Sequence, residues 1–344
     1  MIRFREARDD DDGALTELIA RPMPGHLSLS FRRSPSYLQS CRGCGPLRRV
    51  LVAEVQGQVV AMCSFYLREY HWMGQPRPVW MLGDFRALPG AAGRSITGQG
   101  WRAVRGLLEG HPALISVVEE NQRALQLFSK PRRSWPHLHP VGDLTTEISP
   151  LWLQPKGRHA YSVRWLESSR VIDFLGCRRR PLSPLVEEAD FGSVLPLRGR
   201  FWGVFDAQER LVGCAGLSEP WLFGGHRQVA IAGYHGPYAW LYRLQRLLRQ
   251  SWLPAPGEEV RLSTAVLLDC PDPAAFRALF HGLQLEAREV GSQFLVWNRP
   301  DPEHLSLWDR LRFRYRSRFY QLLWEGDQPL PPIPSPIGYE LSWL

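Results

Sequence analysis

Alternation of apolar and polar residues predicts two β-hairpins that lie far apart in the chain. The first covers residues 49–67 (RVLVAEVQGQVVAMCSFYL) and turns at Gln56-Gly57, and the second covers residues 201–217 (FWGVFDAQERLVGCAGL). A period of two places every second side chain on the same face of a strand, so both stretches fit half-buried antiparallel pairs. A glycine-containing turn is typical of such a hairpin.

Residues 79–130 predict strand, glycine-rich loop, helix, strand and helix in that order. The strand VWMLGDFRALP (79–89) leads into GAAGRSITGQGWRAVRGLLEG (90–110), and ALISVVEEN (113–121) leads into a helix over 121–130. A glycine-rich turn before a helix presents unpaired N–H groups and the positive end of the helix dipole. The segment therefore predicts a binding place for the phosphates of a cofactor.

The two hairpins and their following segments repeat at a constant distance. Cys63 and Cys214 occupy matching places in the hairpins, and LISVVEENQRALQLF aligns with LSTAVLLDCPDPAAFRALF through Asn121 and Asp272. The offset is about 151 or 152 residues for both pairs of segments, which indicates a duplicated domain. We place the first copy at residues 1–150 and the second at 151–300, with a tail at 301–344.

Further elements follow from the same patterns. We expect strands at 2–6 and 141–148, a helix that begins at Asp9–Asp12, a second short helix at 34–40 with Pro35 near its start, and a hairpin at 283–298. The tail contains an extended stretch, SRFYQLLWE (317–325), for which the second copy has no place. It either crosses back to complete the first sheet, which would remove an open edge, or lies as a helix on the surface.

Composition narrows the class of protein. The chain has 344 residues, 44% hydrophobic and 22% charged, with no apolar run of about 20 residues and no apolar signal core at its start. We expect a cytoplasmic, bacterial protein with no membrane partner. The net charge of +8 rests almost entirely on arginine, which we read as a coding bias, so nucleic acid is a disfavoured partner.

Cysteine and histidine spacing does not predict a metal site. Cys41 and Cys44 form one CxxC, and His137 and His139 form an HxH that we place in a loop, but no second pair follows at a usual distance. A structural zinc site needs four ligands, so we predict no metal. Cys63, Cys214 and Cys270 lie in apolar strands and are expected to be buried thiols.

The order of these elements resembles the GCN5-related N-acetyltransferase (GNAT) superfamily. In that superfamily a strand ending in V-x-P leads into a loop of the form R/Q-x-x-G-x-G/A, and here Ala87-Leu88-Pro89 matches the strand end, while Gly93 and Arg94 match part of the loop. Asn121, Ala124 and Leu127 match the N-x-x-A-x-x-L pattern of the following helix. The resemblance implies an α/β (α+β) protein of two tandem GNAT-like domains, each a mixed, mostly antiparallel twisted sheet flanked by helices.

Three positions depart from the family pattern. Ala92 stands where the loop has Arg or Gln, and Ser95 stands where it has Gly, unless a loop two residues longer puts Arg94 in the Arg position. Phe128 stands where many members have a tyrosine that acts as a general acid, and a phenyl ring cannot donate a proton. The second copy has YHGPYAW (234–240) at its corresponding turn, and we expect no cofactor there.

The resemblance implies acetyl-CoA or another acyl-CoA as the cofactor. In such enzymes the pyrophosphate lies on the loop amides, and the pantetheine arm pairs with the preceding strand. The corresponding cofactor-binding residues of this chain are Phe85, Arg86, Ala87, Leu88, Gly93, Arg94, Ser95, Ile96, Thr97 and Asn121.

Two carboxylates are candidates for the proton acceptor. Asp84 shares a strand face with Arg86, and Glu120 ends the neighbouring strand; each could accept the proton of the attacking amine or could be an ordinary paired or solvated acid. In the family the segment between the first two helices borders the acceptor site. Arg32, Arg33 and Tyr37 in that segment would suit an acceptor that carries a carboxylate.

The sequence thus favours an acyl-CoA-dependent N-acyltransferase that acts on a small amine by direct attack on the thioester. The alternative is a GNAT-like protein without catalytic activity that binds acyl-CoA as a sensor or scaffold, which the three departures favour. Hydrolase and nucleotide-loop motifs are absent from the sequence.

Overall fold

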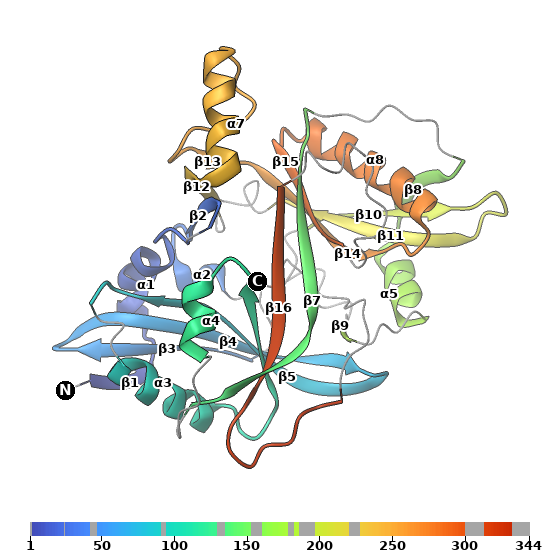
Figure 1. Ribbon diagram of the computed structural model, residues 1–344. Coiled ribbons are helices and arrows are strands. Elements are labelled where there is room, and N and C mark those ends of the chain that lie inside the picture. Colours follow the sequence, from blue (N-terminus) through green and yellow to red (C-terminus); the bar gives the residue numbers. More distant parts are fainter. Residues whose placement is uncertain are drawn as a thin grey trace.

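The computed structural model describes residues 2–23, 25–41, 47–90, 94–128, 135–152, 160–177, 182–185, 197–219, 228–299 and 313–331. Figure 1 shows strands of both halves of the chain side by side, with α3 and α4 beside the first half and α5 and α8 beside the second.

The first half alternates strands with short helices. Its elements are β1 (Ile2–Glu6), a 3-10 turn η1 (Asp9–Asp11), α1 (Asp12–Ile19), β2 (Leu27–Arg32), α2 (Tyr37–Ser40), β3 (Leu47–Val55), β4 (Gln58–Trp72), β5 (Gln75–Ala87), α3 (Arg94–Leu107), β6 (Ala113–Val118), α4 (Gln122–Phe128) and β7 (His137–Pro150).

The second half follows a similar order and ends in a strand. Its elements are β8 (Ser162–Leu166), α5 (Ser168–Cys177), β9 (Leu182–Pro184), β10 (Leu197–Phe205), β11 (Leu211–Ser218), β12 (Gln228–Tyr234), α7 (Gly236–Leu247), β13 (Glu259–Val260), β14 (Leu262–Asp269), α8 (Pro273–Glu289), β15 (Phe294–Arg299) and β16 (Phe313–Leu323).

The predicted α/β class is confirmed, and the two halves share one mixed sheet of 13 strands. Its order is β1-β3-β4-β5-β6-β16-β7-β15-β14-β11-β10-β8, with β9 paired to β4. The pairs β5–β6 and β14–β15 are parallel, while the other described pairs are antiparallel. Antiparallel pairing of β7 with β15 joins the halves.

Two-residue turns connect the long strands of the first half. The predicted turn at Gln56-Gly57 has φ of 52° and 81°, and Met73-Gly74 between β4 and β5 has the same pair of values. Positive φ at both central residues matches the right-handed twist of the flanking strands. The hairpin predicted at residues 49–67 is therefore confirmed as β3–β4.

The tail strand β16 lies between β6 and β7. Ser317 is opposite Val118 of β6, and Phe313 is opposite Ile148 of β7. The extended stretch therefore crosses back into the first sheet, which is one of the two alternatives that the sequence left open. This pairing covers the edges of β6 and β7.

The sequence predicts four details differently from the structure. Residues 283–289 belong to α8 and not to a hairpin, because Asp272 caps that helix and apolar side chains bury at a helical spacing: Ala275, Leu279, Leu283 and Ala287. The helix α2 begins at Tyr37, and the strand β2 precedes it. Pro35 lies before the N-cap residue Ser36. His137 and His139 lie on β7, not in a loop.

A small second sheet joins the halves on another side. Its order is β13-β12-β2, and β2 pairs with β12 across a sequence separation of about 200 residues. Since β12 lies in this small sheet, β11 pairs directly with β14.

Apolar clusters cover both faces of the first-half strands. Leu51, Cys63 and Phe65 pack with Trp101 and Val104 of α3 on one face. On the other face Val52 and Met62 pack with α1 and α2 through Leu15, Leu18 and Tyr37. Adjacent strand residues thus take opposite faces, as the alternation predicts.

The internal repeat also has a structural counterpart. The side chain of Asn121 accepts a hydrogen bond from the Ala124 N–H (3.1 Å), and Asp272 accepts one from the Ala275 N–H (2.7 Å). Both residues therefore cap the helix that follows the matching strand.

Candidate functional site

Strands β5 and β6 separate soon after they pair. Their parallel ladder consists of Trp80–Ala113, Met81–Leu114 and Leu82–Ile115. Beyond it β5 continues along β4, where Ala87 pairs with Ala61, and β6 continues along β16. A V-shaped gap therefore opens between two neighbouring strands of one sheet.

A bulge on β5 lies at the point of separation. Met62 of β4 is opposite Arg86, while Ser64 is opposite Gly83, so β5 has one extra residue between these pairs. Asp84 in this stretch has φ of 52°, the left-handed region that few residues other than glycine adopt. An extra residue bends the bulged strand, which accounts for the divergence of β5 from β6.

A cavity of about 340 Å³ occupies the gap and extends beneath α3. Its walls are mostly apolar and come from β1, β3, β4, β5, β6, α3 and α4, with Met23 at one side. The lining residues are Phe4, Met23, Leu51, Val52, Ala53, Ala61, Met62, Cys63, Phe85, Arg86, Ala87, Ile96, Thr97, Gly100, Trp101, Val104, Ile115, Ser116, Val117, Val118, Asn121, Ala124 and Phe128.

Most of the predicted cofactor-binding residues meet at this cavity. Phe85, Arg86 and Ala87 line it from β5, Ile96 and Thr97 line it from the first turn of α3, and Asn121 lines it from the start of α4. Because the first N–H groups of a helix have no partner within the helix, the first turn of α3 presents donors beside this wall.

The other predicted cofactor-binding residues are placed differently. The Leu88 N–H donates to the Val60 carbonyl (2.8 Å), its side chain packs with the α1–α2 cluster, and it is not among the described residues that line the cavity. Gly93 lies outside the described residues. Arg94 and Ser95 begin α3, and their side chains lie outside the described part of the chain.

Aromatic rings form one wall of the cavity. Trp101 lies 5.4 Å from Phe85 and 5.3 Å from Phe128, measured between ring centroids, and Phe128 lies 6.4 Å from Trp135. Phe128 thus packs as part of an apolar row. The position carries no proton donor.

Glycines let α3 approach this row and the sheet. A Cβ atom on Gly98 would lie 3.0 Å from the indole nitrogen of Trp135, and one on Gly100 would lie 3.3 Å from the ring of Phe4. In the same helix, a Cβ atom on Gly106 would meet nothing within 4 Å. Gly98 and Gly100 therefore set the spacing of the cavity walls.

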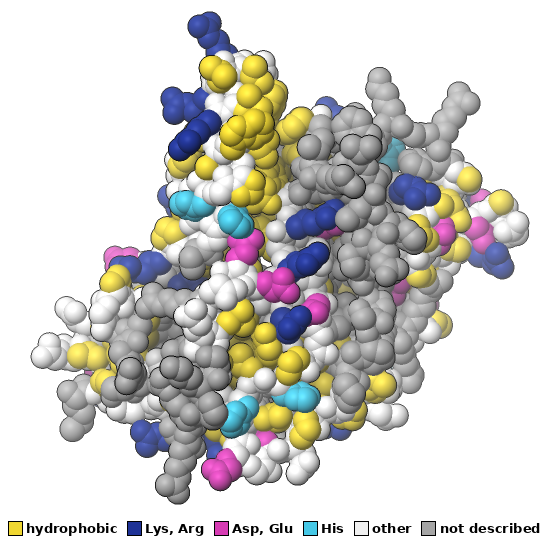
Figure 2. Space-filling view, viewed as in Figure 1, with side chains coloured by type: hydrophobic (Ala, Val, Ile, Leu, Met, Phe, Trp, Pro, Cys, Tyr) yellow, Lys and Arg dark blue, Asp and Glu magenta, His cyan; other side chains and the backbone are white. Residues whose placement is uncertain are grey.

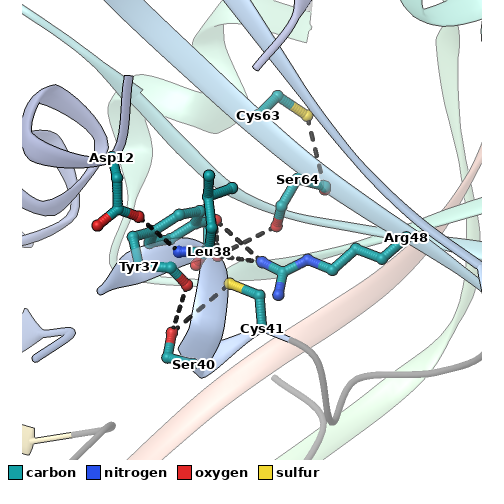
Figure 3. Close-up of polar contacts among 9 residues, drawn as sticks. Asp12, Tyr37, Leu38, Ser40, Cys41, Arg48, Cys63 and Ser64 are labelled. Atoms are coloured by element: carbon teal, nitrogen blue, oxygen red, sulfur yellow. Dashed lines mark hydrogen bonds and ion pairs between the residues drawn. The ribbon is translucent and has the colours of Figure 1, made fainter. Parts of the chain in front are cut away.

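Asp84 is the centre of a polar cluster on the α1–α2 face of the sheet. Its carboxylate accepts hydrogen bonds from the Tyr37 hydroxyl (2.7 Å) and the Ser64 hydroxyl (3.1 Å). Arg48 lies 3.9 Å from the same carboxylate and donates to the Tyr37 oxygen (3.1 Å). Figure 3 shows Tyr37, Ser64 and Arg48 converging from α2, β4 and β3.

The charges of this cluster set its proton affinities. Burial raises the pKa of the Asp84 carboxyl, but Arg33, the Tyr37 hydroxyl, Arg48 and Arg86 act against it and bring the pKa below its ordinary value. Burial, with a smaller contribution from Asp84, raises the pKa of Tyr37 well above its usual range. Asp84 is therefore a carboxylate and Tyr37 a neutral phenol near neutral pH.

Arg86 connects this cluster to the cavity. It lines the cavity and lies close enough to Asp84 to lower the pKa of the carboxyl. Burial lowers the pKa of the Arg86 guanidinium, although Asp84 opposes this shift. Among the described lining residues, Arg86 is the charged one, and it lies next to Asp84.

The remaining predicted residues divide between the cluster and other places. Arg33 is buried, and its charge lowers the pKa of the Asp84 carboxyl. The Tyr37 hydroxyl donates a hydrogen bond to the Asp84 carboxylate. Arg32 is exposed, and its backbone pairs with Gln228 of β12. Glu120 accepts a hydrogen bond from the His26 N–H (2.9 Å) and is exposed, so it holds the segment that follows Met23. Asp84 and Glu120, the two catalytic candidates, therefore have different surroundings.

Sequence reasoning missed Arg48 and Ser64. Both lie on the predicted hairpin or at its edge, where strand alternation could have placed Ser64 on the same face as Met62. The cluster forms because the bulge at Asp84 turns this side chain toward them, and the sequence has no marker for that bulge.

Groups of metal ligands are not found among the described residues. Cys41 is buried, while Cys44 lies outside the described part of the chain. Cys63, Cys214 and Cys270 are buried thiols, as predicted. In the described second half, direct pairing of β11 with β14 replaces the gap found between β5 and β6.

Comparison with known proteins gives matches in structure and none in sequence. No protein-family model matches the chain, and no curated protein matches it. Saccharomyces cerevisiae N-myristoyltransferase with bound myristoyl-CoA is similar with a TM-score of 0.59 at 11% identity, over 93% of this chain and 82% of that one. A second structure of that enzyme covers 99% of this chain and 85% of its own, again at a TM-score of 0.59 and 11% identity.

A structure from Anabaena variabilis is also similar. A GCN5-related N-acetyltransferase from Anabaena variabilis matches with a TM-score of 0.51 at 8% identity, over 93% of this chain and 72% of that one. At such identities the likeness concerns the fold. Together with the repeat of hairpin, strand and capped helix, it shows that the chain has a tandem GNAT-like fold.

Proposed function

We propose that this protein is an acyl-CoA-dependent N-acyltransferase whose cofactor site is the gap between β5 and β6. The observation that carries the proposal is the three-pair ladder of these strands, which ends at a cavity lined by the first turns of α3 and α4. The structural neighbours named for N-myristoyl and N-acetyl transfer support the same general activity.

The gap suits two parts of coenzyme A, the pantetheine arm and the pyrophosphate. Beyond Leu82, the β5 backbone that turns away from β6 offers an edge along which the pantetheine arm can add as a strand, as we predict for Phe85–Ala87. The first turn of α3, with Ile96 and Thr97, offers N–H donors and a positive dipole end for the pyrophosphate. Neither contact needs a metal.

The reaction is the direct attack of a neutral amine on the thioester. A C–N bond forms, the C–S bond breaks, the sulfur leaves as the thiolate, and the amine loses a proton. Backbone N–H groups of β5 near the bulge are the candidates for stabilising the oxyanion. Asp84 is the candidate to attract the ammonium form of the acceptor and to take its proton through water.

Residues of the polar cluster also fit the acceptor. Arg33 and Arg86 lie near Asp84, so an amine bound beside that carboxylate could place a carboxylate of its own against a guanidinium. This arrangement supports a small amine with an anionic group. Arg32, exposed on β2, is not part of this arrangement.

The cavity also supports an acyl group longer than acetyl. Beneath α3 it continues between Gly100 and Trp101 on one side and Leu51, Ala53 and Cys63 on the other, where the walls are apolar. A polar or charged group would lose hydration there, whereas a hydrocarbon chain gains from burial.

A protein that binds acyl-CoA without transfer is the second candidate. Phe128 in the aromatic row and the lowered pKa of the Asp84 carboxyl favour it, because a phenyl ring cannot donate a proton and a carboxylate with a lowered pKa is a weaker base. If either candidate is correct, acyl-CoA raises the melting temperature of the protein. A ligand at 100 times its Kd adds about 2.7 kcal/mol to the free energy of unfolding.

Turnover separates the two candidates. We expect the full chain to release free CoA thiol from an acyl-CoA in the presence of an amine panel that includes amino acids, and to do so faster than in the absence of amine. Stabilisation without amine-dependent thiol release would support the binding protein, and no stabilisation by acyl-CoA would contradict both.

A further inference from the structure

Helix α7 projects from the body of the protein, and this position is independent of the proposed acyltransferase site. Figure 1 shows it standing above the small sheet of β2, β12 and β13. One side of the helix is anchored: Gln245 is buried and exchanges two hydrogen bonds with the backbone of Leu253 (2.9 and 2.6 Å). Tyr238 and Leu241 pack on the cluster around Ile231.

The opposite side of α7 is apolar and exposed. Trp240 is 63% exposed, Leu247 is 80% exposed, and Leu248 just after the helix is 50% exposed. Positions separated by seven and eight residues lie on one side of a helix, so these three side chains form a single stripe. Figure 2 shows hydrophobic side chains along one side of this projection.

Basic side chains border the stripe. Arg243, Arg246 and Arg249 are all exposed, and the sequence from Gly236 to Gln250 contains no Asp or Glu. Figure 2 shows basic side chains gathered on another side of the same projection. The helix thus combines an apolar stripe with arginines that no acidic residue of the same segment neutralises. These features are complementary to a surface with an anionic outer layer over an apolar interior.

We propose that α7 docks on an anionic lipid bilayer. Trp240 lies in the interfacial region, where its ring is apolar and its N–H remains hydrated, while Leu247 and Leu248 enter the acyl boundary. The three arginines contact lipid phosphates. The helix is convex and offers no groove, which suits a lipid surface better than a peptide.

This mode of binding differs from the one that the sequence analysis excluded. None of the described helices is long and apolar enough to cross a membrane. An interfacial helix lies in the plane of the bilayer and needs only one apolar side. The expectation of no membrane partner rested on spanning segments, whereas the proposed binding at α7 is peripheral.

Docking at α7 would also orient the cavity. The His235 N–H at the start of α7 donates to the His26 carbonyl (2.7 Å), and the His26 N–H is bound by Glu120. Met23, a few residues before His26, lines the cavity. One hydrogen bond therefore links the base of the proposed lipid-binding helix to His26, and a second links His26 to Glu120, the neighbour of the lining residue Asn121.

Vesicle sedimentation of the full chain tests the proposal. We expect binding to vesicles of phosphatidylcholine mixed with phosphatidylglycerol, little binding to phosphatidylcholine alone, and weaker binding at high salt. The double variant Arg243→Gln/Arg246→Gln should lower the partition coefficient about 30-fold, because each arginine near an anionic surface contributes to binding. Trp240→Ser/Leu247→Ser should also lower it.

The matched control lies on the solvent-exposed side of α8. Leu285 is 44% exposed and Arg288 is exposed, so Leu285→Ser/Arg288→Gln changes the same residue types elsewhere. We expect this control to bind as the unchanged chain does, with all variants showing the same melting temperature. The proposal is overturned if the unchanged chain does not bind anionic vesicles, or if the α7 and α8 variants bind alike. It is also overturned if the stripe instead mediates a concentration-dependent dimer, seen in sedimentation velocity, that the Trp240 variant abolishes.

Discussion

Replacing Gly100 by leucine should shorten the acyl chain that the protein binds. Gly100 lines the cavity beneath α3, and a Cβ atom there would already lie 3.3 Å from the ring of Phe4. The ring of Phe4 is half-buried and can shift by the few tenths of an ångström that this contact demands. The rest of the leucine side chain must then occupy space inside the cavity.

The size of the effect follows from the displaced hydrocarbon. A leucine side chain fills the room of about four methylene groups, and each buried methylene contributes about 0.8 kcal/mol. We therefore expect Gly100→Leu to weaken a long-chain acyl-CoA by about 3 kcal/mol, which is roughly a hundredfold in Kd. Affinity for CoA and acetyl-CoA should change little, since their contacts lie nearer the gap.

Calorimetric titration measures this difference without any assumption about the acceptor. CoA, acetyl-CoA, hexanoyl-CoA and dodecanoyl-CoA would be titrated into the unchanged chain, Gly100→Leu and the control Gly106→Leu. Gly106 belongs to the same helix but has nothing within 4 Å of its would-be Cβ, so the control tests helix effects alone. Equal losses for all four ligands, or no chain-length dependence in either protein, would refute the placement of the acyl chain beneath α3.

Three further predictions concern stability. Asp84→Asn should destabilise the fold by about 1–3 kcal/mol at neutral pH, because Arg33, Arg48 and Arg86 lose their carboxylate partner. The folded pKa of Asp84 lies below its unfolded value, so this stabilisation is present above about pH 4 and is lost as the pH falls through the folded pKa. Urea unfolding should show a smaller difference between the two proteins at acid pH, and an equal difference at both pH values would contradict the ionised state of Asp84. Within α3, Gly106→Ala should raise the unfolding free energy by about 0.5–1 kcal/mol through helix propensity, whereas Gly98→Ala should lower it, because its Cβ would lie 3.0 Å from Trp135. Thermal melts of the two variants measure this difference. Equal shifts in melting temperature would contradict it and show that the Trp135 side chain moves aside without cost. A chain ending before Phe313 should lose β16 and fail to give a cooperative melt, because β6 and β7 lose their shared neighbour. An unchanged melting temperature would show that β16 is dispensable.

Local patterns predicted the parts of the fold that depend on neighbouring residues. Alternation and the Gln56-Gly57 turn gave the β3–β4 hairpin, because positive φ at both positions is a local requirement. The match of Asn121 with Asp272 gave two helix starts that the structure shows to be capped alike. The crossover of the tail strand β16 was one of two alternatives, and the count behind it included a hairpin at 283–298 that the structure replaces by the end of α8 and β15.

Long-range pairing and backbone irregularity were not accessible in this way. The strand β2 forms against β12 from the other half of the chain, and its own residues do not specify that partner. Arg48 and Ser64 join Asp84 only because the bulge on β5 turns this side chain toward them. In α8 the burial of Leu283 and Ala287 on one helix face overrides the strand-like appearance of residues 283–290.

The central claim is that acyl-CoA binds in the gap between β5 and β6. A crystal structure of the full chain grown with saturating acyl-CoA tests it most directly. The account predicts pantetheine density along Phe85–Ala87, the pyrophosphate at the first turn of α3 beside Thr97, and the acyl chain directed beneath α3 toward Gly100. Density for the cofactor in the second half of the chain, or an empty gap at saturating ligand, would contradict it.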